Sequence, residues 1–199
     1  MKCLVREEPY RITGATRGEI ARAIAILGPM RGGVRFAAFT DWEVVYRVRA
    51  GAPPPSVEVR AVVRLPDLVA PLSATADLRE AFARYVDALR RHEGGHVAIA
   101  ESAGHAVREA LSALPESAGP RDVDRAARTA IASAHARERA YDLETSHGAT
   151  QGASLWPPRQ PPSLVATTDP HDRDPRTARR RTLTTATFAS PPSDERDTE

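Results

Sequence analysis

Residues 89–100 read LRRHEGGHVAIA, and the pentapeptide HEGGH within them lies inside the longest helical pattern of the chain. On a helix, side chains four residues apart share one face, so His92 and His96 can direct two imidazoles at one cation. Glu93 lies beside that face, where it could act on a metal-activated water without being a ligand. The pentapeptide fits H-E-x-x-H, a zinc-hydrolase signature that also arises by chance, so the surrounding sequence has to decide its meaning.

An apolar stripe with steps of three or four residues predicts one long helix over residues 76–114. The stripe comprises Leu78, Phe82, Tyr85, Leu89, His92, His96, Ile99, Ala103, Val107, Ala110 and Leu114. Two neutral imidazoles buried on this face would need hydrogen-bond partners. Gly94 and Gly95 each cost a helix about 1 kcal/mol relative to alanine, which an active-site helix could tolerate because another strand or a substrate must approach closely there. Both features favour a metal site over simple core packing.

A catalytic zinc site needs a third protein ligand and an open position. The connection after the long helix is short, so a second helix over residues 121–146 should return antiparallel to it. At the constant rise of a helix, it regains the level of HEGGH near Tyr141. Asp142 lies at that level on the inner face of the second helix. It is therefore the first choice for the third ligand.

Two other residues remain open as the third ligand. His147 follows the second helix, where the chain turns, and Glu138 lies one turn before Asp142. If Asp142 binds the metal, His147 could hydrogen-bond a developing oxyanion as a catalytic residue. If His147 binds instead, Asp142 could orient a ligand histidine.

The rest of the first half predicts a small sheet. Two β-rich stretches at residues 34–48 and 57–65 indicate a hairpin, and alternation in the second implies one buried face that helices cover. A short strand at residues 10–13 and a helix at residues 18–27 precede it. The predicted fold class is therefore α+β, with a small antiparallel sheet packed on a long active-site helix and a second antiparallel helix.

Composition limits the partners that we expect. The chain has 199 residues, a formal net charge of +2 and 41% hydrophobic residues. A charge this small does not indicate nucleic-acid binding, and no stretch approaches the roughly 18 apolar residues of a membrane span. We expect a folded domain at residues 1–156 and a disordered tail, rich in Pro, Arg, Ser and Thr, at residues 157–199. Cys3 is the only cysteine, so no intramolecular disulfide can form.

Several short motifs occur along the chain. They are YRITG at residues 10–14, GP at 28–29, FTDW at 39–42, HEGGH at 92–96 and YDLETSHG at 141–148. Through them the chain resembles the bacterial family of predicted secreted zinc-dependent proteases, also called domain of unknown function 922. Over residues 9–156 the resemblance implies a zincin-like fold. It places His92, Glu93, His96, Asp142, Thr145 and His147 in the region of the site.

The resemblance also implies a secreted or envelope protein. The N-terminus MKCLVREEPY has no apolar signal-peptide core, so the chain as written would be cytoplasmic unless its true start lies upstream.

We therefore expect a zinc-dependent metallopeptidase that acts on a peptide or protein substrate. Zn²⁺ would be held by His92, His96 and Asp142, or by His147 in place of Asp142, and Glu93 would be the general base. An edge of the hairpin could hold an extended peptide by strand addition. The rival hypotheses are a non-catalytic zincin-fold module that binds an envelope or peptide partner, and a zinc hydrolase that cleaves a non-peptide amide.

Overall fold

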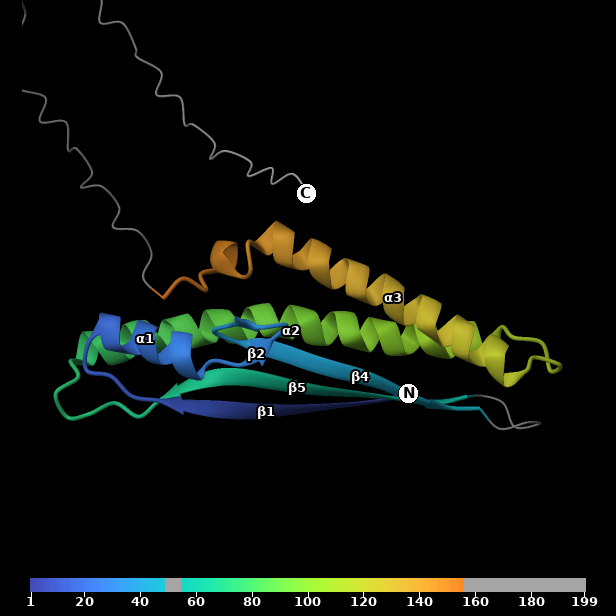
Figure 1. Ribbon diagram of the computed structural model, residues 1–199, viewed down its shortest axis with the longest axis horizontal. Helices are drawn as coiled ribbons and strands as arrows, with labels where there is room; N and C mark the ends of the chain where they lie inside the picture. Colours follow the sequence, from blue (N-terminus) through green and yellow to red (C-terminus); the bar gives the residue numbers. More distant parts are fainter. Residues whose placement is uncertain (49–54, 156–199) are drawn as a thin grey trace, which may run out of the picture. The chain divides into compact units, whose positions relative to one another are not determined.

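The computed structural model describes residues 1–48 and 55–155, and these residues form an α+β fold (Figure 1). The strands are β1 (Lys2–Ile12), β2 (Met30–Arg31), β3 (Val34–Arg35), β4 (Phe39–Arg47) and β5 (Ser56–Leu68). The helices are α1 (Arg17–Leu27), α2 (Ala76–Ser112) and α3 (Pro120–Thr145), followed by the 3₁₀ turn η1 (Ala149–Gln151). The predicted disordered tail at residues 157–199 lies outside the described residues.

The two long helices agree with the sequence-based prediction. Helix α2 begins at Ala76, where the Thr75 hydroxyl accepts a hydrogen bond from the backbone N–H of Leu78, and α3 begins at Pro120. They run antiparallel side by side on one face of the sheet (Figure 1). Ala127 and Ala134 of α3 are fully buried, and such small residues let the two helices approach closely.

The main sheet has the strand order β1–β5–β4. The predicted hairpin is confirmed for most of its length, because β4 and β5 pair antiparallel from Phe39 opposite Arg64 to Arg47 opposite Ser56. Its first strand is shorter than the predicted range of residues 34–48, since Val34 and Arg35 pair with β2 instead. The buried face of β5 points toward the helices. It carries Val57, Val59, Ala61, Val63 and Leu65, all at most 5% exposed.

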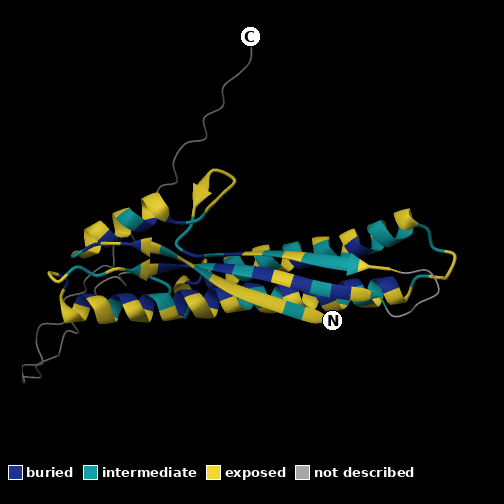
Figure 2. Cartoon of the chain, turned by 90° about the horizontal axis from the view of Figure 1, so that it is seen from below, coloured by how far each residue is buried: buried dark blue, intermediate teal, exposed yellow. Residues whose placement is uncertain are grey.

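The expectation of a purely antiparallel sheet is wrong for one of the two strand pairs. Strand β1 is much longer than the predicted strand at residues 10–13 and pairs parallel with β5, from Lys2 opposite Glu58 to Ile12 opposite Leu68. Strand β1 forms an outer edge of the sheet, and most of its residues are exposed (Figure 2). Because few of its side chains are buried, its sequence does not need the alternating apolar residues by which a strand is recognised. The sheet is therefore mixed.

Strand β5 also continues beyond its predicted end at residue 65 and runs through Pro66. Beyond Arg64, the last residue that faces β4, one side of β5 has no strand partner among residues 1–48 and 55–155. The missing N–H of a proline costs no ladder bond when it points to such a free side.

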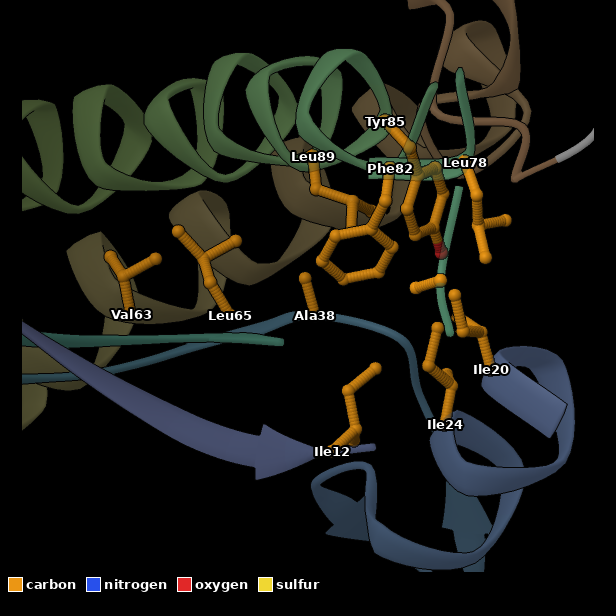
Figure 3. Packing of buried hydrophobic residues seen from close by; sticks show 11 residues of the cluster. Ile12, Ile20, Ile24, Ala38, Val63, Leu65, Leu78, Phe82, Tyr85 and Leu89 are labelled. Atoms are coloured by element: carbon orange, nitrogen blue, oxygen red, sulfur yellow. The ribbon is translucent and has the colours of Figure 1, made fainter. Parts of the chain in front are cut away.

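Helix α1 covers the end of the sheet at which the chain enters α2. Its Ile20 and Ile24 point toward Ile12 of β1 and toward the first half of α2 (Figure 3). The chain then forms the β2–β3 ribbon, whose turn residues Gly32 and Gly33 have φ of 56° and 82°, in the left-handed region that glycine adopts readily. None of the helices in the described ranges has a stretch long and apolar enough to cross a membrane.

Candidate metal centre

The antiparallel pair of long helices brings together three of the predicted site residues. Asp142 Oδ1 lies 3.3 Å from His92 Nε2 and 3.1 Å from His96 Nε2. Within the described ranges, these residues form a group whose potential ligand atoms all lie within 4.8 Å of one another. Both imidazoles are buried, and the Asp142 side chain is about one third exposed.

The spacing of these atoms fits a zinc ion. Tetrahedral zinc lies about 2.0–2.2 Å from nitrogen and oxygen ligands, so neighbouring ligand atoms are about 3.3 Å apart. The distances from Asp142 Oδ1 to the two imidazole nitrogens are close to that value. The donor set of two imidazoles and one carboxylate is also one that zinc accepts. The residues present therefore fit the metal that the sequence predicts.

The other ring nitrogen of each histidine faces an oxygen atom. His92 Nδ1 lies 3.1 Å from Gln151 Oε1, and His96 Nδ1 lies 3.5 Å from Glu138 Oε1. Such partners fix the tautomer that leaves Nε2 available to a metal. Burial, and then the charge of His96, lower the pKa of His92 and favour its neutral form.

Tyr141 fixes the orientation of the His92 ring. The two rings stack with centroids 5.1 Å apart, and Gln151 Nε2 donates a hydrogen bond to the tyrosine hydroxyl over 3.0 Å. That hydroxyl donates in turn to the backbone carbonyl of His92 over 3.2 Å. Gln151 was not predicted, because it belongs to η1, whose packing has no periodic signal in the sequence.

Glu138, an alternative third ligand from the sequence, has other partners here. Trp42 Nε1 donates to its Oε1 over 2.7 Å, and its Oε2 lies 2.9 Å from His135 Nδ1. Burial alone raises the pKa of Glu138, but the hydrogen bonds from His96, Trp42 and His135 lower it to about 2. Glu138 therefore stays ionised and faces the back of the His96 ring. The spacing of three residues between His135 and Glu138 on one helix is the signal that could have predicted their contact.

Glu93 lies next to the histidine pair in a buried position, and Thr40 Oγ1 donates to its Oε2 over 2.7 Å. Burial raises the pKa of Glu93, although the hydrogen bond from Thr40 opposes the shift. The sequence placed Thr40 on a strand but gave no reason to pair it with Glu93, because the contact depends on how β4 lies across α2.

His147 lies at the rim of the same site. Its Nδ1 is 3.8 Å from Asp142 Oδ1, and its side chain is 72% exposed. The turn that presents it is left-handed at three successive residues, since Ser146, His147 and Gly148 have φ of 49°, 52° and 82°. A side chain at Gly148 would meet the His92 ring, so glycine is needed for this close approach.

These groups share one open cleft of about 640 Å³. Its walls come from α2, from α3 and from the segment at residues 35–40 that leads into β4. His92, Glu93, His96, Glu138, Asp142 and His147 all line the cleft. The arrangement combines a potential metal site with a buried carboxylate that a bound molecule can reach.

The two glycines of the pentapeptide have different surroundings. A Cβ at Gly95 would overlap the phenol ring of Tyr141, whereas a Cβ at Gly94 would meet nothing within 4 Å. A close approach is therefore found at Gly95 only, and the Tyr141 side chain of α3 makes it, not the strand or substrate that the sequence led us to expect.

We expect Gly95→Ala to destabilise the fold by about 1–3 kcal/mol, as overpacking does, and to weaken metal binding by displacing Tyr141 from His92. Gly94→Ala is the matched control and should be neutral or stabilise by up to about 1 kcal/mol, since alanine is the better helix former. Thermal unfolding of both variants with and without zinc measures the difference. Equal unfolding temperatures would contradict the role assigned to Gly95.

Most of the chain matches a known protein family. Residues 7–148 match the family described as "Bacterial protein of unknown function (DUF922)". No curated protein and no solved structure matches the chain. The matched region includes α2, α3 and the turn that follows α3 as far as residue 148. It therefore contains His92, Glu93, His96, Asp142 and His147.

Proposed function

Since the chain belongs to the DUF922 family of bacterial proteins of unknown function, we propose its function from the chemistry of its centre. We infer that the protein is a zinc-dependent metallopeptidase with a zincin-like fold. The observation that carries this proposal is the cluster of His92, His96 and Asp142, with ligand atoms within 4.8 Å of one another, in a cleft that also contains Glu93.

In this proposal His92, His96 and Asp142 hold Zn²⁺, and His147 is the alternative to Asp142. The bound ion supplies Lewis-acid chemistry that acidifies water and polarises a carbonyl group. The protein holds the ligand rings in place through Gln151 and Glu138, which face the Nδ1 atoms.

Glu93 acts as the general base. Thr40 occupies its Oε2, and Oε1 has no hydrogen-bond donor among the described residues, so Oε1 can take a proton from the attacking water. Glu93 then delivers this proton to the leaving amine. Burial, which raises the pKa of Glu93, makes the carboxylate a stronger base. His147 at the rim can donate a hydrogen bond to the developing oxyanion.

The sheet supplies a binding surface for an extended peptide. Strand β4 is an edge strand, and its Phe39 and Thr40 line the cleft. An extended chain can add to such an edge through backbone hydrogen bonds, which would carry its carbonyl groups past the centre. This edge favours a peptide over a small amide as substrate.

We expect protein purified without added zinc to contain stoichiometric zinc and to cleave members of a mixed peptide library. A chelator should abolish cleavage, and added zinc should restore it. Elemental analysis and mass spectrometry of the products measure the two properties. Cleavage that survives in His92→Ala would exclude this centre, whereas stoichiometric zinc without any cleavage would favour a binding module.

A further inference from the structure

Three arginines line the same cleft as the candidate metal centre. Arg31 and Arg35 come from the β2–β3 ribbon, and Arg139 comes from α3, one residue after Glu138. All three are exposed residues. The ribbon itself is exposed along its length and projects away from the sheet (Figure 2). A molecule in the cleft would therefore meet guanidinium groups from two separate elements.

The carboxylates of the cleft do not neutralise these arginines. Glu93 is bonded to Thr40, Glu138 to Trp42 and His135, and Asp142 faces the two histidines. Each carboxylate is thus directed toward the centre, and within the described part of the chain none of the three forms an ion pair with a cleft arginine. A divalent cation bound at the centre would offset part of the negative charge of these carboxylates, so they would attract the cleft arginines less.

The arginines themselves are largely available to a ligand. Arg139 has no hydrogen-bond or ion-pair partner among the described residues. Arg35 Nη1 donates to the backbone carbonyl of Gly28 over 2.7 Å, which positions the guanidinium, and no carboxylate in the part of the chain that the structure describes pairs with it. Arg31 lies 3.6 Å from Asp41, but both side chains are about 60% exposed, and such surface pairs contribute little.

We propose that Arg35 and Arg139, supported by Arg31, form a carboxylate-binding subsite of the cleft. This inference rests on the proposed peptidase function and specifies its substrate class, namely peptides with a carboxylate close to the bond to be cleaved. A planar guanidinium matches a carboxylate with two parallel hydrogen bonds, which gives orientation as well as attraction. The carboxylate can belong to an acidic side chain or to the C-terminus of the peptide.

The test measures binding separately from cleavage. Zinc-loaded full-length Glu93→Gln protein is titrated into short fluorescein-labelled peptides, and fluorescence anisotropy gives the dissociation constants. One peptide carries a glutamate and a C-terminal amide, the second a glutamine and a free C-terminal carboxylate, and the third a glutamine and a C-terminal amide. We expect one of the first two to bind about five- to ten-fold more tightly than the third, as for a solvent-accessible charged hydrogen bond. Tighter binding of the first peptide would identify an acidic side chain as the source of the carboxylate, and tighter binding of the second would identify the C-terminus.

Variants of the arginines locate the subsite. Arg139→Gln or Arg35→Gln, each added to Glu93→Gln, should remove most of the difference in dissociation constant between the carboxylate peptide and the third peptide. High salt should also reduce this difference, because it screens the charges. Arg137→Gln is the matched control, because it removes the same charge from an exposed position of α3 outside the cleft. It should leave the preference unchanged. An equal loss in Arg137→Gln would show that only the overall charge matters and would overturn the proposal.

Cleavage of the same peptides by wild-type protein separates the two proposals. If wild type cleaves all three peptides and Glu93→Gln binds them equally, the subsite is refuted and the peptidase stands. If Glu93→Gln shows the preference while wild type cleaves none of them, nor any library peptide, the subsite stands as a binding site and the peptidase fails.

Discussion

Glu93→Gln is expected to lower the rate of peptide hydrolysis by about 10²- to 10⁴-fold, the usual contribution of a general base, without loss of zinc. Glutamine has the shape of glutamate and can still accept the hydrogen bond that Thr40 Oγ1 donates over 2.7 Å. It cannot take a proton from water. Because Glu93 is not among the three clustered potential ligands, the metal site should remain intact.

The variant is compared with wild type by initial rates on the best library peptide, by elemental analysis and by thermal unfolding. Thr40→Val provides a second measurement, because it removes only the group that holds the carboxylate. It should lower the rate less than Glu93→Gln does. Full activity in Glu93→Gln, with unchanged zinc, would mean that another group acts as the base.

The helical half of the fold and the centre of the cluster were predictable, because a helix has a constant rise and repeat. Counting residues back from the connection placed Tyr141 at the level of HEGGH, and the Tyr141 hydroxyl indeed bonds to the His92 carbonyl. The same periodicity placed His92 and His96 on the buried face of α2. The regular geometry of the two helices was therefore enough to predict a contact between residues about fifty positions apart in the sequence.

The parts that were missed depend on long-range pairing. Strand β1 lies at an edge of the sheet, and its exposed residues have no alternating pattern that would reveal it. The contacts of Thr40 with Glu93 and of Trp42 with Glu138 depend on how β4 lies over the two helices. No spacing in the sequence encodes that arrangement, so the strand could be predicted but not its partners.

Replacement of a proposed zinc ligand is expected to have the largest effect on metal binding. Loss of even an indirect partner of a zinc ligand commonly weakens affinity about 10- to 100-fold, so loss of a ligand should exceed that range. We expect this loss in His96→Ala and in Asp142→Ala. Competition with a zinc chelator of known affinity measures it, and thermal unfolding shows whether each variant remains folded.

His147→Ala is the comparison that assigns the roles of the two residues. Its Nδ1 lies 3.8 Å from Asp142 Oδ1, and its side chain is mostly exposed, whereas Asp142 Oδ1 is within 3.3 Å of both imidazoles. If Asp142 is the ligand, His147→Ala should keep most of its zinc affinity and lose hydrolytic rate, since only an oxyanion donor is removed. The opposite pattern, with zinc lost in His147→Ala and retained in Asp142→Ala, would make His147 the ligand. Asp142 would then serve to orient the two imidazoles, because its Oδ1 already lies between them.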